Sequence, residues 1–109
     1  MRSNLLITGG LGYVGSFTAK NYLKKTKKKS LVIDNLSRGN IFAKKYSNSK
    51  IFDVSSKNVK KIIDDYKINI ILHLASYTCV RESIKNKSLY FKNFKSQINF
   101  IKNIKDNNV

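Results

Sequence analysis

Three glycines near the start of the chain have the spacing of a turn that binds a diphosphate. Gly9, Gly12 and Gly15 follow an apolar run at residues 5–7, and a segment with helical periodicity begins near residue 13. In such a turn the first glycine permits a tight bend, the second lets the backbone approach a diphosphate, and the third lets helix and strand pack closely. The N–H groups at the start of the helix would face the phosphates. The alternative is a tight strand-to-helix turn that binds nothing.

Asp34 is the second residue that could do chemistry. It ends the apolar segment 30–34, about 20 residues beyond the glycine turn, where an acidic side chain binds the ribose hydroxyls of adenosine. A carboxylate there repels a 2′-phosphate, which favours NAD over NADP. Arg38 argues the reverse, since an arginine can accept that phosphate, but it lies in the loop and not at the strand tip. Asp34 could instead form a turn, as Asn35 and Ser37 could.

Two further positions carry weaker signals. Asp53 and Val54 end a third apolar segment, beside the predicted cofactor site, although a helix cap at Asp53 or Ser55 explains the aspartate equally well. His73 is the only histidine. Nothing beside it indicates a catalytic triad or a metal site, so we predict a packed or hydrogen-bonded side chain. The sequence therefore predicts no catalytic residue and no metal ligand.

These residues need strands and helices to position them. Hydrophobic periodicity predicts strands over residues 4–8, 30–34, 50–54 and 69–74, and helices over 13–25, 56–67 and about 89–106, with a short helix over 41–46. Alternating strands and helices predict an α/β fold, a Rossmann-like doubly wound parallel sheet of about four strands in the order 3-2-1-4. The ligand is expected at the carboxyl ends of the strands. Residues 69–74 are apolar on both faces, which is typical of a central strand.

Length and composition set the remaining limits. The 109 residues are 41% hydrophobic, which suits one domain over residues 1–109. The net charge of +16 comes mostly from scattered lysines, and the densest run, residues 24–29, is expected to be a solvated loop. The alternative for that run is attraction to nucleic acid or to a membrane, but we predict no specific partner of either kind. No apolar run reaches the roughly 20 residues that span a bilayer, and no signal peptide is recognised. The lone Cys79 fits a reducing, cytoplasmic location.

Three motifs in this order resemble the extended short-chain dehydrogenases/reductases, and among them the UDP-glucose 4-epimerases. They read TGGLGYVGS at residues 8–16, DNLSRGN at 34–40, and HLAS at 73–76 followed by VRES at 80–83. The resemblance covers nearly the whole chain, but only the N-terminal part of the family's fold. It implies the NAD-binding part of an isomerase of galactose metabolism, which interconverts UDP-glucose and UDP-galactose through a 4-keto intermediate.

The resemblance also implies which residues contact NAD. Besides the glycine turn, they would be Tyr13, Val14, Asp34, Asn35, Leu36, Ser37, Arg38, Gly39, Asp53, Val54, Leu74, Ala75, Ser76, Tyr77 and Thr78, with Asn93 added by a less regular match. Two positions depart from the family pattern. Thr78 stands where epimerases often carry a lysine near cofactor and sugar, and Ser88 stands where proline is usual. Both departures bear on the substrate and leave the NAD motif intact.

Catalysis in this family uses a Tyr-x-x-x-Lys pair and a nearby serine or threonine, in which the tyrosine removes the proton of the sugar 4-hydroxyl as hydride passes to NAD. No such pair occurs at the expected place, and Tyr46-x-x-x-Lys50 lies far from it. We therefore expect the chain alone to be inactive. A C-terminal part would complete the nucleotide-sugar site, and a second copy or a complementing chain is a candidate partner.

Other interpretations stay open. The chain could belong to another nucleotide-sugar epimerase or a 4,6-dehydratase, or it could be a catalytically silent NAD-binding fragment that works by association. A basic nucleic-acid binder ranks last.

Overall fold

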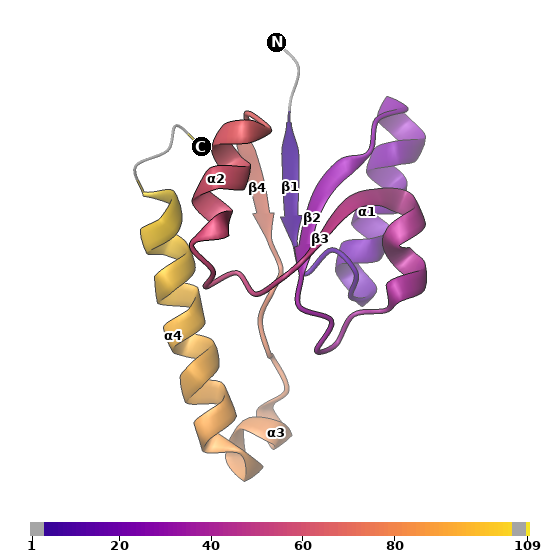
Figure 1. The fold of residues 1–109 in the computed structure, drawn as a ribbon. Helices are drawn as coiled ribbons and strands as arrows, with labels where there is room; N and C mark the ends of the chain where they lie inside the picture. Colours follow the sequence, from indigo (N-terminus) through magenta and orange to yellow (C-terminus); the bar gives the residue numbers. More distant parts are fainter. Residues whose placement is uncertain (1–3, 106–108) are drawn as a thin grey trace.

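A four-stranded parallel sheet forms the centre of the computed structural model, which describes residues 4–105 and 109 (Figure 1). The strands lie in the order β3-β2-β1-β4, and all three neighbouring pairs are parallel. This arrangement confirms the predicted fold class and the predicted order 3-2-1-4. The strands are β1 (Leu5–Thr8), β2 (Ser30–Asp34), β3 (Ser47–Ile51) and β4 (Ile70–His73).

Helices cover both faces of the sheet, as a doubly wound fold requires (Figure 1). One face carries α1 (Tyr13–Thr26) and the short 3₁₀ helix η1 (Ile41–Tyr46), and the other carries α2 (Asn58–Asp65) and α4 (Lys87–Ile104). The short α3 (Val80–Lys85) lies between β4 and α4 in the chain. The predicted end of the last helix, at residue 106, falls outside the described residues. Within residues 4–105, none of the helices has the length and apolar character needed to cross a membrane.

The alternation of side chains along β1 and β2 builds the two halves of the core. Leu6 and Ile33 face α2 and α4 and join a cluster that contains the buried Phe100. Ile7 and Val32 face the opposite way and pack with Leu11 and Ala19 beneath α1. Burial on both faces explains why these two strands are continuous apolar runs in the sequence.

The third strand begins and ends three residues earlier than predicted. The prediction was residues 50–54, whereas β3 pairs with β2 from Ser47 to Ile51. Because β3 lies at an edge of the sheet, four of its five residues are polar and most are partly or fully exposed, so hydropathy does not mark it. The apolar side chains of Phe52 and Val54, which shaped the prediction, follow the strand and pack on the core from the loop.

The fourth strand is the other edge of the sheet. Its sequence is typical of a central strand, yet 48% of Ile70 and 37% of Leu72 are exposed. The helix α4 exposes a further apolar row, Phe94, Ile98 and Ile101, at the spacing of a single helix face. These surfaces are apolar but uncovered within the part of the chain that the structure describes.

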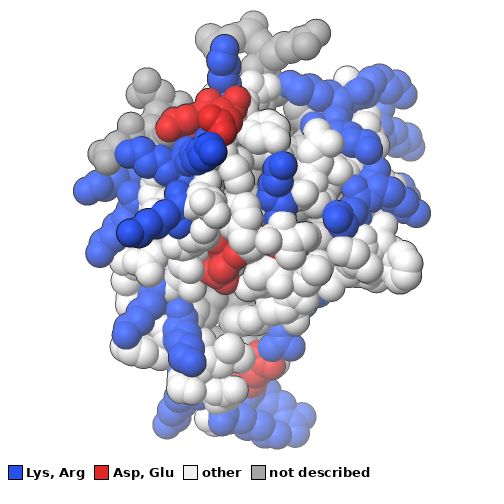
Figure 2. Space-filling view, viewed as in Figure 1, with Lys and Arg blue, Asp and Glu red and all other residues white. Residues whose placement is uncertain are grey.

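Basic side chains are spread widely over the molecule. On the face in Figure 2, Lys and Arg lie along both flanks and at the lower end, and the middle is largely uncharged. The densest run begins on the helix and not in a loop, because Lys24 and Lys25 belong to the last turn of α1.

Candidate functional site

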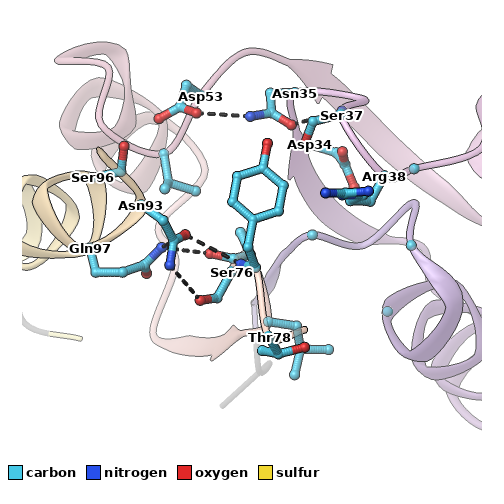
Figure 3. A pocket seen from close by; sticks show the side chains of 18 of the residues that line it. Asp34, Asn35, Ser37, Arg38, Asp53, Ser76, Thr78, Asn93, Ser96 and Gln97 are labelled. Atoms are coloured by element: carbon cyan, nitrogen blue, oxygen red, sulfur yellow. Dashed lines mark hydrogen bonds between the residues drawn. The ribbon is translucent and has the colours of Figure 1, made fainter. Parts of the chain in front are cut away.

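A cavity of about 600 Å³ opens at the carboxyl ends of the strands. The glycine turn after β1 and the loops after β2 and β3 form one side of it, and the segment after β4 together with α4 forms the other (Figure 3). This is the place where doubly wound sheets bind their ligands, since the strand order reverses between β1 and β4.

The glycine turn has the conformation that its spacing predicts. Gly9 has φ = 69°, in the left-handed region that favours glycine, and its carbonyl accepts the N–H of Gly12 at 3.1 Å. A Cβ on Gly15 would lie 2.2 Å from that same carbonyl oxygen, so only glycine lets α1 approach the turn this closely. A Cβ on Gly12 would meet only the Gly9 oxygen, at 3.3 Å.

The N-terminus of α1 faces this cavity. Gly12 is the N-cap residue and no described side chain caps the helix there. Tyr13 and Val14 follow it, line the cavity and are largely exposed. An uncapped helix start presents unpaired N–H groups and the positive end of the helix dipole, which together suit an anion such as a diphosphate.

Asp34 both stabilises the loop after β2 and lines the cavity. Its carboxylate is buried and accepts the N–H of Leu11 at 3.0 Å on one oxygen and the N–H of Leu36 at 2.8 Å on the other. The predicted turn-forming role is therefore present. Each carboxylate oxygen keeps a second acceptor site, and Asp34 lines the cavity, so the same group can also accept hydroxyl donors.

Asp53 ties the loop after β2 to the loop after β3. It accepts the amide of Asn35 at 2.9 Å (Figure 3). It also accepts both the N–H and the hydroxyl of Ser55, at 2.9 and 2.7 Å. Burial raises the pKa of Asp53, but hydrogen bonds from Ser55, Asn35 and Ser96 outweigh it and lower the pKa below the usual value. Asp53 thus holds the cavity wall as an ionised acceptor.

The opposite wall is held by amide side chains of α4. Asn93 donates to the hydroxyl of Ser76 at 3.2 Å and accepts the N–H of Tyr77 at 3.3 Å. Gln97 donates to the carbonyl of Ala75 at 2.8 Å. Figure 3 shows Asn93 and Gln97 reaching from α4 toward the segment after β4. These bonds fix the backbone of the segment that lines the cavity.

Arg38 and Glu82 form an ion pair beside the cavity, with 2.5 Å between a guanidinium nitrogen and a carboxylate oxygen. The hydroxyl of Tyr90 also donates to Glu82, at 3.2 Å, and accepts the N–H of Cys79 at 2.9 Å. The guanidinium lies 5.0 Å from the ring centroid of Tyr77. Its hydrogen bond with Glu82 raises the pKa of Arg38 above its already high value.

Nearly all of the predicted site residues line this cavity. Leu36 does not, because its side chain turns inward and packs on the core under α1. The predicted residues that line the cavity are Gly9, Gly12, Tyr13, Val14, Gly15, Asp34, Asn35, Ser37, Arg38, Gly39, Asp53, Val54, Leu74, Ala75, Ser76, Tyr77, Thr78 and Asn93.

Sequence reasoning missed several further lining residues. They are Phe52, Cys79, Glu82, Leu89, Tyr90, Lys92, Ser96 and Gln97. Helical spacing could have found Ser96 and Gln97, which lie three and four residues beyond Asn93 on the predicted last helix. Glu82 was part of a matched motif, but nothing in the sequence placed it opposite Arg38.

His73 was predicted to be packed or hydrogen-bonded, and it is an exposed, hydrogen-bonded side chain. Its Nδ1 lies 2.6 Å from the hydroxyl of Thr8, its Nε2 contacts Gln97, and its ring stacks on Phe100 at 4.3 Å. Among residues 4–105 and 109, no group of three His, Cys, Asp or Glu side chains could hold a metal ion.

Tyr46 and Lys50 lie away from the cavity. Tyr46 ends η1 and its ring contacts Lys20 and Lys45, whereas Lys50 is in β3 and its ammonium lies 5.7 Å from the ring of Tyr66. Neither residue lines the cavity. They do not form the family's catalytic pair in this structure.

Comparison with known proteins shows where this fold occurs. The UDP-glucose 4-epimerase of Lactobacillus helveticus is 33% identical over 110 residues, which cover 96% of this chain and 32% of that protein. The UDP-Glc/GlcNAc 4-epimerase of Campylobacter jejuni has a TM-score of 0.82 at 33% identity, covering 94% of this chain and 33% of the other. The UDP-glucose 4-epimerase of Brucella ovis, solved in complex with NAD, has a TM-score of 0.84 at 25% identity, covering 94% and 32%.

These matches extend over nearly all of this chain and over a small part of its relatives. The chain spans 32% of the length of the Lactobacillus helveticus enzyme and 16% of the length of the bifunctional protein GAL10 of Kluyveromyces lactis, which is 32% identical over 114 residues. The resemblance to UDP-glucose 4-epimerases, predicted from three motifs, is confirmed. The model of the NAD dependent epimerase/dehydratase family matches residues 5–109. The chain therefore belongs to the NAD dependent epimerase/dehydratase family.

Proposed function

We propose that this chain binds NAD in the cavity at the carboxyl ends of β1, β2 and β4. The observation that carries the proposal is that the uncapped N-terminus of α1 and the carboxylate of Asp34 face one cavity. A dinucleotide needs an anion site for its diphosphate and an acceptor for its ribose hydroxyls, and these two features supply them. The left-handed turn at Gly9 and the close approach at Gly15 fit the same ligand, because they bring the helix start to the end of the strand.

Each part of the cavity has a role in this proposal. The backbone from Gly12 to Val14 holds the diphosphate, and Asp34 accepts the adenosine ribose hydroxyls. The loop fixed by Asp53 and Asn35 forms the wall near the adenosine. The segment after β4, fixed by Asn93 and Gln97, forms the wall on the far side.

The chain is proposed to serve a nucleotide-sugar 4-epimerase, for which UDP-glucose and UDP-galactose are the leading substrates. Support comes from the family and from relatives that are themselves UDP-glucose 4-epimerases. When bound, NAD supplies the hydride acceptor for oxidation at the sugar C4. Another UDP-sugar is the main alternative, since a related structure is a UDP-Glc/GlcNAc 4-epimerase.

In this proposal, the chain binds the cofactor, and residues outside it carry out proton transfer. A hydride acceptor without a positioned base oxidises an alcohol poorly, since general acid–base catalysis contributes about 10²–10⁴-fold. We therefore expect the 109-residue chain alone not to interconvert UDP-glucose and UDP-galactose. The exposed edge at β4 and the apolar row on α4 favour a partner, either a second copy or a complementing chain that adds a strand beside β4. We also propose a cytoplasmic location, because the lone Cys79 fits a reducing compartment.

The experiment is a calorimetric titration of the purified chain with NAD and with NADP. We expect tighter binding of NAD, because Asp34 repels the 2′-phosphate of NADP. Gly12→Val is expected to abolish binding of both, because a branched side chain would occupy the place of the diphosphate.

The matched control is Asn21→Val, which adds a branched side chain to an exposed position of the same helix, outside the cavity. Thermal unfolding of both variants checks that they fold. Equal affinity of the wild type for the two cofactors, or unchanged affinity in Gly12→Val, would contradict the proposal.

A further inference from the structure

Arg38 is a second residue that could affect the choice between NAD and NADP. It lies in the loop after β2, lines the cavity near Asp34, and is the kind of residue that accepts the 2′-phosphate of NADP. An arginine there would weaken the preference for NAD that Asp34 creates. In this structure, however, the guanidinium of Arg38 is already engaged by another side chain.

The guanidinium of Arg38 is held from the other side of the cavity. Glu82, in α3, accepts a hydrogen bond from it at 2.5 Å. The ring of Tyr77 lies under it, with the centroid 5.0 Å away, which is within range of a cation–π contact. Two contacts thus direct the charge of Arg38 toward α3.

Glu82 is itself held in place. The hydroxyl of Tyr90 donates to the same carboxylate oxygen, at 3.2 Å, and that hydroxyl accepts the N–H of Cys79. The side chain of Glu82 is 29% exposed, against 58% for Arg38, so the acceptor is the more enclosed partner. The carboxylate is therefore positioned before any ligand arrives.

We propose that Glu82 is a specificity-determining residue, which engages Arg38 and withholds its guanidinium from a cofactor 2′-phosphate. The inference rests on the proposed function, since it concerns how the NAD site discriminates against NADP. A 2′-phosphate that reaches Arg38 would compete with Glu82 for the guanidinium, and it would stand near two carboxylates, Glu82 and Asp34. NAD carries no such phosphate and leaves the pair intact.

The size of the effect follows from the exposure of the pair. An ion pair that is partly open to water contributes little, and its removal changes an equilibrium by only a few-fold. We therefore expect Glu82→Gln to improve the affinity for NADP relative to NAD by roughly two- to fivefold.

The test is a double-mutant cycle read by calorimetry with NAD and NADP on the wild type, Glu82→Gln, Arg38→Gln and the double variant. The expected result is that Glu82→Gln shifts the ratio of affinities toward NADP and that the shift disappears when Arg38 is also replaced. Arg38→Gln is expected to change the ratio more in the Glu82→Gln background than in the wild type. Thermal unfolding of each variant confirms a folded protein.

Two controls separate this pair from general charge effects. Asp65→Asn removes one negative charge from an exposed position of α2 and should leave the ratio unchanged. Lys92 is the other basic residue among the described residues that line the cavity, so it tests whether any nearby positive charge produces the shift. Lys92→Ala in the Glu82→Gln background should retain the shift toward NADP.

An unchanged ratio in Glu82→Gln, or a shift that survives in the double variant, would overturn the inference while NAD binding stands. Failure of the wild type to bind NAD at all would overturn the proposed function, and the inference with it.

Discussion

Asp34 serves both the fold and the proposed ligand, which makes its removal costly in two ways. Asp34→Ala is expected to weaken NAD binding and to narrow the preference over NADP. It should also lower the free energy of unfolding by about 1–3 kcal/mol, because the N–H groups of Leu11 and Leu36 lose their acceptor. Calorimetry with both cofactors and chemical denaturation measure the two effects.

Asp65→Ala is the control for this variant, because it removes an exposed carboxylate from α2. It should leave both quantities close to those of the wild type. An Asp34→Ala protein that is as stable as the wild type and binds NAD equally well would show that neither role exists.

Single residues with a strict local role were predictable from the sequence. The conformation of Gly9 and the packing of Gly15 follow from the spacing of the turn, and Asp34 follows from its place at a strand end. The Arg38–Glu82 pair was not predictable, since 44 residues separate its members and only the tertiary fold brings them together. Leu36 was predicted to contact NAD by resemblance alone, and the sequence did not indicate that its side chain packs on the core under α1.

At the scale of elements, the loops after β2 and β3 depend on an ionised Asp53. Its pKa in the folded state is lowered from the usual 3.8, so folding is stabilised by the charged form. This contribution is fully present above pH 3.8 and is lost as the pH falls through the lower, folded-state pKa. Asp53→Asn should therefore reduce the dependence of unfolding free energy on pH in the acid range.

Denaturant unfolding of the wild type and the variant, followed from neutral pH down to about pH 2, measures this dependence. Asp64 and Asp65 stay in both proteins, so the difference between the curves reports Asp53. Parallel curves for the two proteins would contradict the role assigned to its hydrogen bonds.

Element boundaries were predictable where one hydrophobic pattern decides them. The buried strand β2 (Ser30–Asp34) was predicted to the residue, and η1 (Ile41–Tyr46) likewise, though as a short helix of unspecified type. The edge strand β3 was displaced by three residues, because its pairing partner and not its hydropathy sets its position. The break between α3 and α4 follows from a cap at Asn86, whose side chain accepts the N–H of Leu89.

At the scale of the whole molecule, the sheet order and the position of the cavity were predictable from the order of strands and helices. The exposure of β4 shows a difference between composition and position. Ile70 and Leu72 belong to a sequence typical of a central strand, yet they stand at an edge. The composition of a strand indicates whether it is suited to be buried between two neighbours. Whether both neighbours are present depends on the strands that pair with it.

The central claim is that NAD occupies the cavity between the glycine turn and α4. Titration of the ¹⁵N-labelled chain with NAD, followed by assigned amide resonances, tests it most directly. We expect saturable shifts at Gly9, Gly12 and Gly15, in the loop from Asn35 to Gly39 and in the segment from Ser76 to Thr78, with little change at Asn48 or Lys61. Shifts confined to other surfaces, or no saturable shifts at all, would contradict it.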